Sequence, residues 1–182
     1  MEDLSIVNVV GGGSIGRELN LQHVYRDFPH SDIEYEPETF AAIVIRYDSP
    51  KGTVMLYRSG KYSLAGAQSP TEAQSVGEKF IRQLEQLFEE KFNQIEFEIR
   101  YLVGTADLGG KLDLNQLAVG LGVDHTEYEP EQFPGLFYRP INEDWFCTLF
   151  ASGKFVIGGV RSREDLEQIA DEIAEKLDCS VK

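Results

Sequence analysis

EYEPETF at residues 34–40 returns as EYEPEQF at residues 127–133, and this repetition decides the fold. Phe40 and Phe133, which end the two copies, are 93 residues apart. The same displacement relates SGK at residues 59–61 to SGK at residues 152–154. A duplication on this scale predicts one structural unit present twice, and two copies are too few for a solenoid or a propeller. We therefore expect two pseudo-symmetric repeats, residues 1–92 and 93–182.

The composition predicts a globular protein, and we expect no cofactor. A chain of 182 residues that is 42% hydrophobic can bury one core or two small fused ones. No apolar run approaches the length of a membrane span, and the acidic N-terminus has no signal-peptide pattern, which predicts a cytoplasmic protein with no membrane partner. Cys147 and Cys179 are the only cysteines, and neither they nor the scattered His23, His30 and His125 have metal-ligand spacing. We expect no disulfide and no metal site.

The net charge of −14 is large for this length. It has two interpretations, an ordinary acidic protein or adaptation to molar salt. The charges are also sorted: acidic residues gather on the predicted long helices, whereas six basic residues lie on or beside the predicted strands: Arg46, Arg58, Lys61, Arg100, Arg139 and Lys154. The total charge therefore does not exclude nucleic acid as a partner.

The periodicity predicts an α+β fold. Each repeat begins with an alternating run, which is residues 4–10 in the first, followed by a glycine-rich turn and a short amphipathic stretch. Strand-like runs follow at residues 40–47, 53–57 and 61–65, and then a long helix that begins with SPTE at residues 69–72, a capping-box pattern. The last helix is expected at residues 163–177 behind a cap at Ser162. No glycine- or proline-rich linker joins the repeats, so we expect them to be fused through one sheet.

Alternation in the hairpins divides their residues between two faces. One face is bulky and apolar and should pack under the long helices: Val54, Leu56, Tyr62 and Leu64, and in the second repeat Cys147, Leu149, Phe155 and Ile157. We call the other side the open face; it comprises Met55, Tyr57, Lys61, Ser63 and Ala65, then Thr148, Phe150, Lys154, Val156 and Gly158. The open face is too apolar for an ordinary solvated surface, and no helix remains to cover it. It is therefore predicted to bind a partner.

These motifs resemble those of the archaeal TATA-box-binding protein family over nearly the whole chain. The resemblance rests on EPEQFPGLFYR at residues 129–139 and FASGKFVI at residues 150–157, with weaker copies at residues 40–46 and 57–64. It implies a saddle in which one curved antiparallel sheet carries two long helices on its convex face. It also implies a transcription initiation factor, not an enzyme. Such a factor binds and bends A·T-rich promoter DNA through the minor groove and recruits transcription factor B and, indirectly, RNA polymerase. The protein would be a monomer on DNA, with a homodimer as an alternative off DNA.

The resemblance also implies roles for individual residues. Four aromatic wedges would intercalate between base pairs: Phe40, Tyr57, Phe133 and Phe150. Base contacts would come from Asn8, Val10, Ser63, Ala65, Tyr101, Val103, Val156 and Gly158. Phosphate contacts would come from Arg46, Ser59, Lys61, Arg139, Ser152 and Lys154. Transcription factor B would contact Glu129, Glu131 and Gln132, although the alternative is that this acidic segment is an ordinary solvated loop.

The sequence departs from the family pattern at four positions. Tyr101 stands where a second central asparagine is expected, Ala65 and Gly158 stand where threonine is usual, and Tyr57 replaces a phenylalanine. These changes predict that backbone docking and bending survive while promoter preference changes. The alternatives are a specialised paralogue with altered DNA specificity, or a protein-interaction module that keeps the fold.

A glycine pattern invites a different assignment. Gly11, Gly13 and Gly16 satisfy G-x-G-x-x-G after a strand, as in dinucleotide sites. The second copy, residues 104–109, lacks the middle glycine, and hairpins follow instead of parallel crossovers. We therefore predict a turn, and no arrangement of nucleophile and base suggests an enzyme.

Overall fold

The computed structural model describes residues 2–92 and 96–180, with side chains described for residues 4–92 and 97–177. The side chain of Cys179 lies outside this range. These described residues form ten strands and four helices. The elements of the first part are β1 (Glu2–Ser14), α1 (Leu21–Asp27), β2 (Ile33–Glu34), β3 (Ala42–Asp48), β4 (Lys51–Tyr57), β5 (Lys61–Ala67) and α2 (Pro70–Phe88). Those of the second part are β6 (Glu96–Asp107), α3 (Leu114–Gly120), β7 (Thr126–Glu127), β8 (Gly135–Tyr138), β9 (Phe146–Phe150), β10 (Lys154–Val160) and α4 (Arg163–Ser180).

The fold is α+β, as predicted, because all ten strands belong to one antiparallel sheet. Their order is β2-β3-β4-β5-β1-β6-β10-β9-β8-β7. Contacts within the chain define two compact units: Asn8–Arg100, and Met1–Val7 together with Tyr101–Lys182. β1 and β6 each contribute residues to both units.

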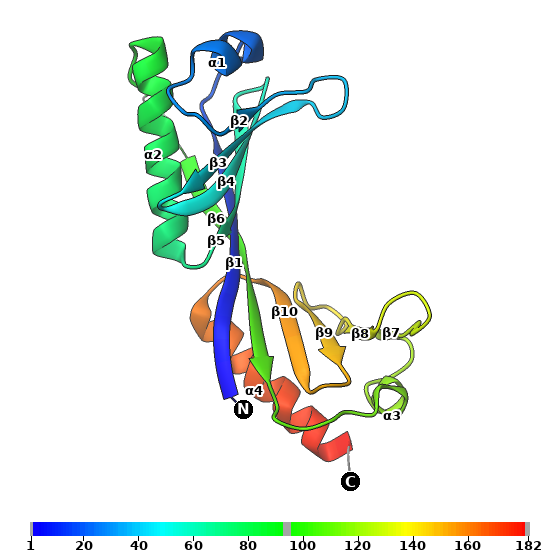
Figure 1. Ribbon diagram of the computed structural model, residues 1–182. Helices are drawn as coiled ribbons and strands as arrows, with labels where there is room; N and C mark the ends of the chain where they lie inside the picture. Colours follow the sequence, from blue (N-terminus) through cyan, green and yellow to red (C-terminus); the bar gives the residue numbers. More distant parts are fainter. Residues whose placement is uncertain (1, 93–95, 181–182) are drawn as a thin grey trace. The chain divides into compact units, whose positions relative to one another are not determined.

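In the unit Asn8–Arg100, α2 packs against the strands β4 and β5 (Figure 1). The helix begins as its sequence predicts, because the Ser69 side chain accepts a hydrogen bond from the Glu72 N–H at 3.1 Å and Pro70 occupies the first turn. The buried side of the helix presents Val76, Phe80 and Leu84, each fully buried. These side chains cover the apolar sheet face, in which all four predicted residues of this repeat are at most 1% exposed.

In the other unit, α4 covers β10 and its neighbours in the same way (Figure 1). Ser162 caps this helix, as predicted, by accepting a hydrogen bond from the Asp165 N–H at 3.0 Å. The helix packs into a core with the four predicted sheet residues of the second repeat, all fully buried. One of them is Cys147, a free thiol whose pKa is raised by burial, so it behaves as an inert core residue.

The glycine-rich stretch differs from the prediction of a turn. Gly11, Gly12 and Gly13 lie inside β1 and pair with Leu64, Ser63 and Tyr62 of β5. The strand continues to Ser14, and only Gly16, at φ +77°, adopts a turn conformation. Long-range pairing thus overrides the local preference of glycine for turns.

Candidate nucleic-acid interface

The repeated EPExF motif folds into the same hydrogen-bonded turn in both units. The Phe40 N–H donates to the Glu36 carbonyl at 2.8 Å, and the Phe133 N–H donates to the Glu129 carbonyl at 2.9 Å. Each turn ends in its aromatic residue just before a strand, β3 or β8. The phenylalanine side chains are 43% and 38% exposed, respectively. The turn therefore holds a large apolar ring away from the core.

Each of these rings meets a second ring, which lies at the end of β4 or β9. The Phe40 and Tyr57 ring centroids are 6.4 Å apart, and those of Phe133 and Phe150 are 6.0 Å apart, both in edge-on geometry. Tyr57 ends β4 and Phe150 ends β9, and both are half-buried. The structure thus brings together both pairs of predicted wedges and places none of the four rings in a core.

The predicted base-contacting residues of the Asn8–Arg100 unit lie on the paired strands β1 and β5. Val10, Ser63 and Ala65 are half-buried, on neighbouring strands. The Asn8 Oδ1 accepts a hydrogen bond from the Gly66 N–H at 2.7 Å, which fixes the amide. No other described group bonds to this amide, so its two N–H donors are available to acceptors of a ligand.

The corresponding residues of the second unit present a different surface. Val103 and Val156 are half-buried and Tyr101 is 38% exposed. Gly158 is buried. A Cβ added there would lie 2.5 Å from Cζ of Phe146, so the Phe146 ring covers this glycine. Phe146 therefore presents its ring at the position where Gly158 itself was expected to contact bases.

Two aromatic residues of the open face were missed by the sequence analysis, namely Phe137 and Phe146. Phe137 is 40% exposed and stacks on Phe133 at 4.9 Å. The Phe137 and Phe146 rings also line a hollow of about 680 Å³ together with Arg139. The repeat held a signal for them: Phe146 pairs with Gly158 as Thr53 pairs with Ala65 in the first repeat.

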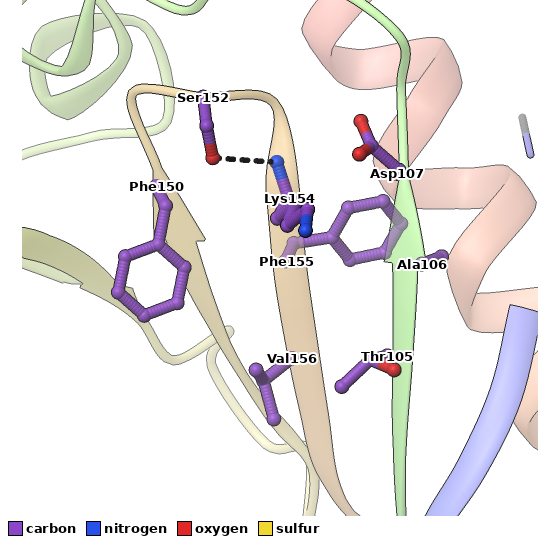
Figure 2. A pocket seen from close by; sticks show the side chains of 8 residues that line it. All are labelled: Thr105, Ala106, Asp107, Phe150, Ser152, Lys154, Phe155 and Val156. Atoms are coloured by element: carbon purple, nitrogen blue, oxygen red, sulfur yellow. Dashed lines mark hydrogen bonds between the residues drawn. The ribbon is translucent and has the colours of Figure 1, made fainter.

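The SGK hairpin turns place the predicted phosphate ligands at the edge of the open face. Ser59 Oγ accepts from the Lys61 N–H at 3.4 Å. Figure 2 shows the equivalent bond of the second turn, in which Ser152 Oγ accepts from the Lys154 N–H at 3.4 Å. Both lysines are exposed and form no ion pair with a described residue. The second turn requires glycine between its serine and its lysine, because at Gly153 (φ +95°) a Cβ would lie 2.1 Å from the Gly110 carbonyl oxygen.

A hollow of about 670 Å³ adjoins the second of these turns. Phe150, Lys154, Val156 and Thr105 are among the residues that line it (Figure 2). An aromatic ring, small side chains, the Lys154 cation and the Asp107 carboxylate thus line one recess, so a phosphate there would be attracted by Lys154 and repelled by Asp107.

The two arginines predicted to contact phosphates differ in their environments. Arg46 is paired with Glu34 at 2.7 Å and with Asp32 at 3.4 Å, and the hydrogen bond that its guanidinium donates to the Glu34 carboxylate raises the pKa of Arg46. Arg139 instead lies over the Phe146 ring, with its Cζ 5.8 Å from the ring centroid. No described carboxylate is paired with Arg139. The guanidinium of Arg139 is therefore more available to a phosphate than that of Arg46.

The predicted acidic contact segment is exposed. Glu129, Glu131 and Gln132 belong to the turn that ends in Phe133, and the Gln132 amide donates to the Glu129 carboxylate. Within the described residues, histidine, cysteine and carboxylate side chains form no cluster that could hold a metal ion. No described helix is long and apolar enough to cross a membrane.

Comparison with known proteins assigns the family. The model of the family "Transcription factor TFIID (or TATA-binding protein, TBP)" matches residues 3–87 and 96–179. The TATA-box-binding protein of Haloarcula marismortui is 40% identical over 176 residues, which is 97% of this chain and 94% of the relative. That of Archaeoglobus fulgidus is 36% identical over 174 residues, with 96% and 94% covered. The solved structure of Methanococcus jannaschii TBP superposes with a TM-score of 0.81 at 38% identity, covering 97% of this chain and 98% of that one.

These relatives are transcription factors that bind DNA and are not enzymes. Their match extends over almost the whole chain and includes both repeats. The chain therefore belongs to the TATA-box-binding protein family.

Proposed function

We propose that this protein starts transcription by binding A·T-rich promoter DNA in the minor groove through its open face. The observation that carries the proposal is the pair of rings outside the core in each unit, exposed Phe40 with half-buried Tyr57 and exposed Phe133 with half-buried Phe150. TATA-box-binding proteins are themselves the standard example of apolar wedges that unstack a base step and bend DNA. Rings held outside the core by a hydrogen-bonded turn are suited to that insertion.

Small apolar side chains beside the wedges support minor-groove recognition. Val10, Val103 and Val156 have no donor or acceptor, and they would crowd the guanine amino group that projects into this groove. The free N–H donors of Asn8 would complement the acceptors of A·T pairs. The face would therefore favour A·T-rich sequences through shape and a few hydrogen bonds.

Cations at the edge would hold the backbone. Lys61, Lys154 and Arg139 are exposed and unpaired among the described residues, with Ser59 and Ser152 at the same turns. Such groups bind phosphates without reading sequence. Arg46 would join them after exchanging its carboxylate partners for phosphate.

The acidic turn of the second unit would recruit transcription factor B, which brings RNA polymerase. Glu129, Glu131 and Gln132 are exposed on the turn that ends in Phe133. We infer that the protein acts as a monomer on DNA.

A DNA-bending assay tests the proposal. An A·T-rich duplex labelled at both ends should shorten its end-to-end distance on binding, and the variant Phe133→Ala/Phe150→Ala should abolish bending and weaken binding about tenfold or more, because two ring–base contacts are lost. Tyr25→Ala is the matched control, since Tyr25 is an exposed aromatic residue on α1, 41% accessible.

Two results would contradict the proposal. Wild-type protein that binds no duplex at any salt concentration would favour the protein-interaction module. Unfolding of the double variant, measured by circular dichroism, would show that the rings are core residues.

A further inference from the structure

The glycine run inside β1 makes room for two side chains of β6 in the unit Asn8–Arg100. A Cβ at Gly11 would lie 2.9 Å from Cζ of Phe97, and a Cβ at Gly12 would lie 3.4 Å from Nη2 of Arg100. Neighbouring residues of a strand point to opposite faces. The two glycines therefore accommodate one aromatic ring and one guanidinium on opposite sides of the sheet.

The guanidinium of Arg100 lies on the open face. Gly12 pairs with Ser63, an open-face residue, whereas Gly11 pairs with Leu64, which is fully buried. Arg100 is exposed, and its head group lies beside a backbone position that carries no side chain. It therefore shares the open face of this unit with Ser63 and Lys61.

The charge of Arg100 is not neutralised by any described residue. Four other arginines form ion pairs within this unit: Arg17 with Glu90, Arg26 with Asp27, Arg46 with Glu34 and Arg58 with Glu18. Arg100 forms none, and Glu98, two residues earlier on the same strand, is not paired with it. An unpaired cation on an apolar face is notable in a chain of net charge −14.

We propose that Arg100 is a further specificity-determining residue, which donates hydrogen bonds to base acceptors in the minor groove. This inference rests on the proposed function. A guanidinium carries only hydrogen-bond donors, which suit the adenine N3 and thymine O2 acceptors. The guanine amino group is itself a donor, so it cannot accept a hydrogen bond from Arg100. Arg100 thus discriminates A·T from G·C pairs, which residues that bind only phosphates cannot do.

Binding to two duplexes tests this role. One is A·T-rich, and the other carries a single G·C pair within the same site. Arg100→Ala should weaken binding to the first about tenfold and reduce the preference between the two duplexes. Arg100→Gln keeps donors without charge and should retain part of the preference. Arg82→Gln is the matched control, because Arg82 is an exposed arginine on α2, which packs on the opposite side of the sheet.

The outcomes separate this inference from the proposed function. If wild-type protein binds and bends DNA while the Arg100 variants equal the Arg82 control, the inference alone is wrong. An equal loss of affinity for both duplexes would mean that Arg100 binds phosphate, which also overturns it. Failure of wild-type protein to bind would overturn both. Gly12 is not a suitable position to vary, since a Cβ there would lie 2.4 Å from the Tyr62 carbonyl oxygen and disturb strand pairing.

Discussion

At the scale of single residues, the two units have diverged in how they present charge. Arg46 has two carboxylate partners, whereas its counterpart Arg139 lies over the Phe146 ring. Exposed ion pairs contribute little to stability, about 0–1 kcal/mol. The pairs of Arg46 therefore matter mainly because they compete with any phosphate for the same guanidinium.

Removing one of these carboxylates should strengthen DNA binding. Glu34→Gln frees Arg46 and removes a negative charge beside the expected phosphate, so we expect affinity to rise about twofold to fivefold in low salt, the range of one exposed ion pair. Fluorescence anisotropy on an A·T-rich duplex measures it. Glu78→Gln on α2 changes the net charge equally and should have little effect. A decrease in affinity for Glu34→Gln would mean that the ion pair positions Arg46 for binding.

At the scale of elements, the helix caps formed as their local motifs predict, whereas the glycine-rich turn did not form where it was predicted. The Ser69 and Ser162 caps form as their motifs predict, because a cap depends on residues three positions away. The glycine run was assigned to a turn because its partners, Phe97 and the strand β5, are distant in sequence.

The missed part of the site has the same cause. The contact of Phe146 with Gly158 depends on strand register. Arg46 is neutralised by Asp32 and by Glu34, and Glu34 lies on β2, a strand of two residues that has no periodicity to detect. The alternating faces, by contrast, followed directly from the hairpin pattern, and the wedge pairs were implied by the resemblance to the family.

The cap of α2 gives a prediction at this scale. Ser69→Ala removes the acceptor for the Glu72 N–H and should lower the free energy of unfolding by about 1 kcal/mol. Ser69→Asp retains an acceptor and should remain close to wild type. Urea denaturation followed by circular dichroism measures both. Equal stability of Ser69→Ala and wild type would mean that packing of the helix, not its cap, fixes where it begins.

At the scale of the whole molecule, the charge of −14 bears on the salt dependence of binding. A protein that releases counterions from DNA loses affinity steeply as salt rises. An acidic surface near the duplex repels phosphates at low salt, and salt screens that repulsion.

We therefore expect binding to an A·T-rich duplex to persist in molar potassium chloride. The slope of log affinity against log salt should be flat or positive, as measured by a fluorescence-bend titration. A steep negative slope would contradict adaptation to molar salt. It would favour the other interpretation, that the net charge is that of an ordinary acidic protein. The neutral osmolyte sucrose serves as a control for water activity.

The turn that ends in Phe133 has one more consequence. A single backbone hydrogen bond, from the Phe133 N–H to the Glu129 carbonyl, ties the ring to the segment that carries Glu129 and Glu131. A protein seated on those carboxylates would stiffen the same loop that aims the ring, so it would lower the entropy lost when the ring enters the duplex. By thermodynamic linkage the effect would be reciprocal: binding of promoter DNA would raise the affinity for the protein seated on the carboxylates by the same factor.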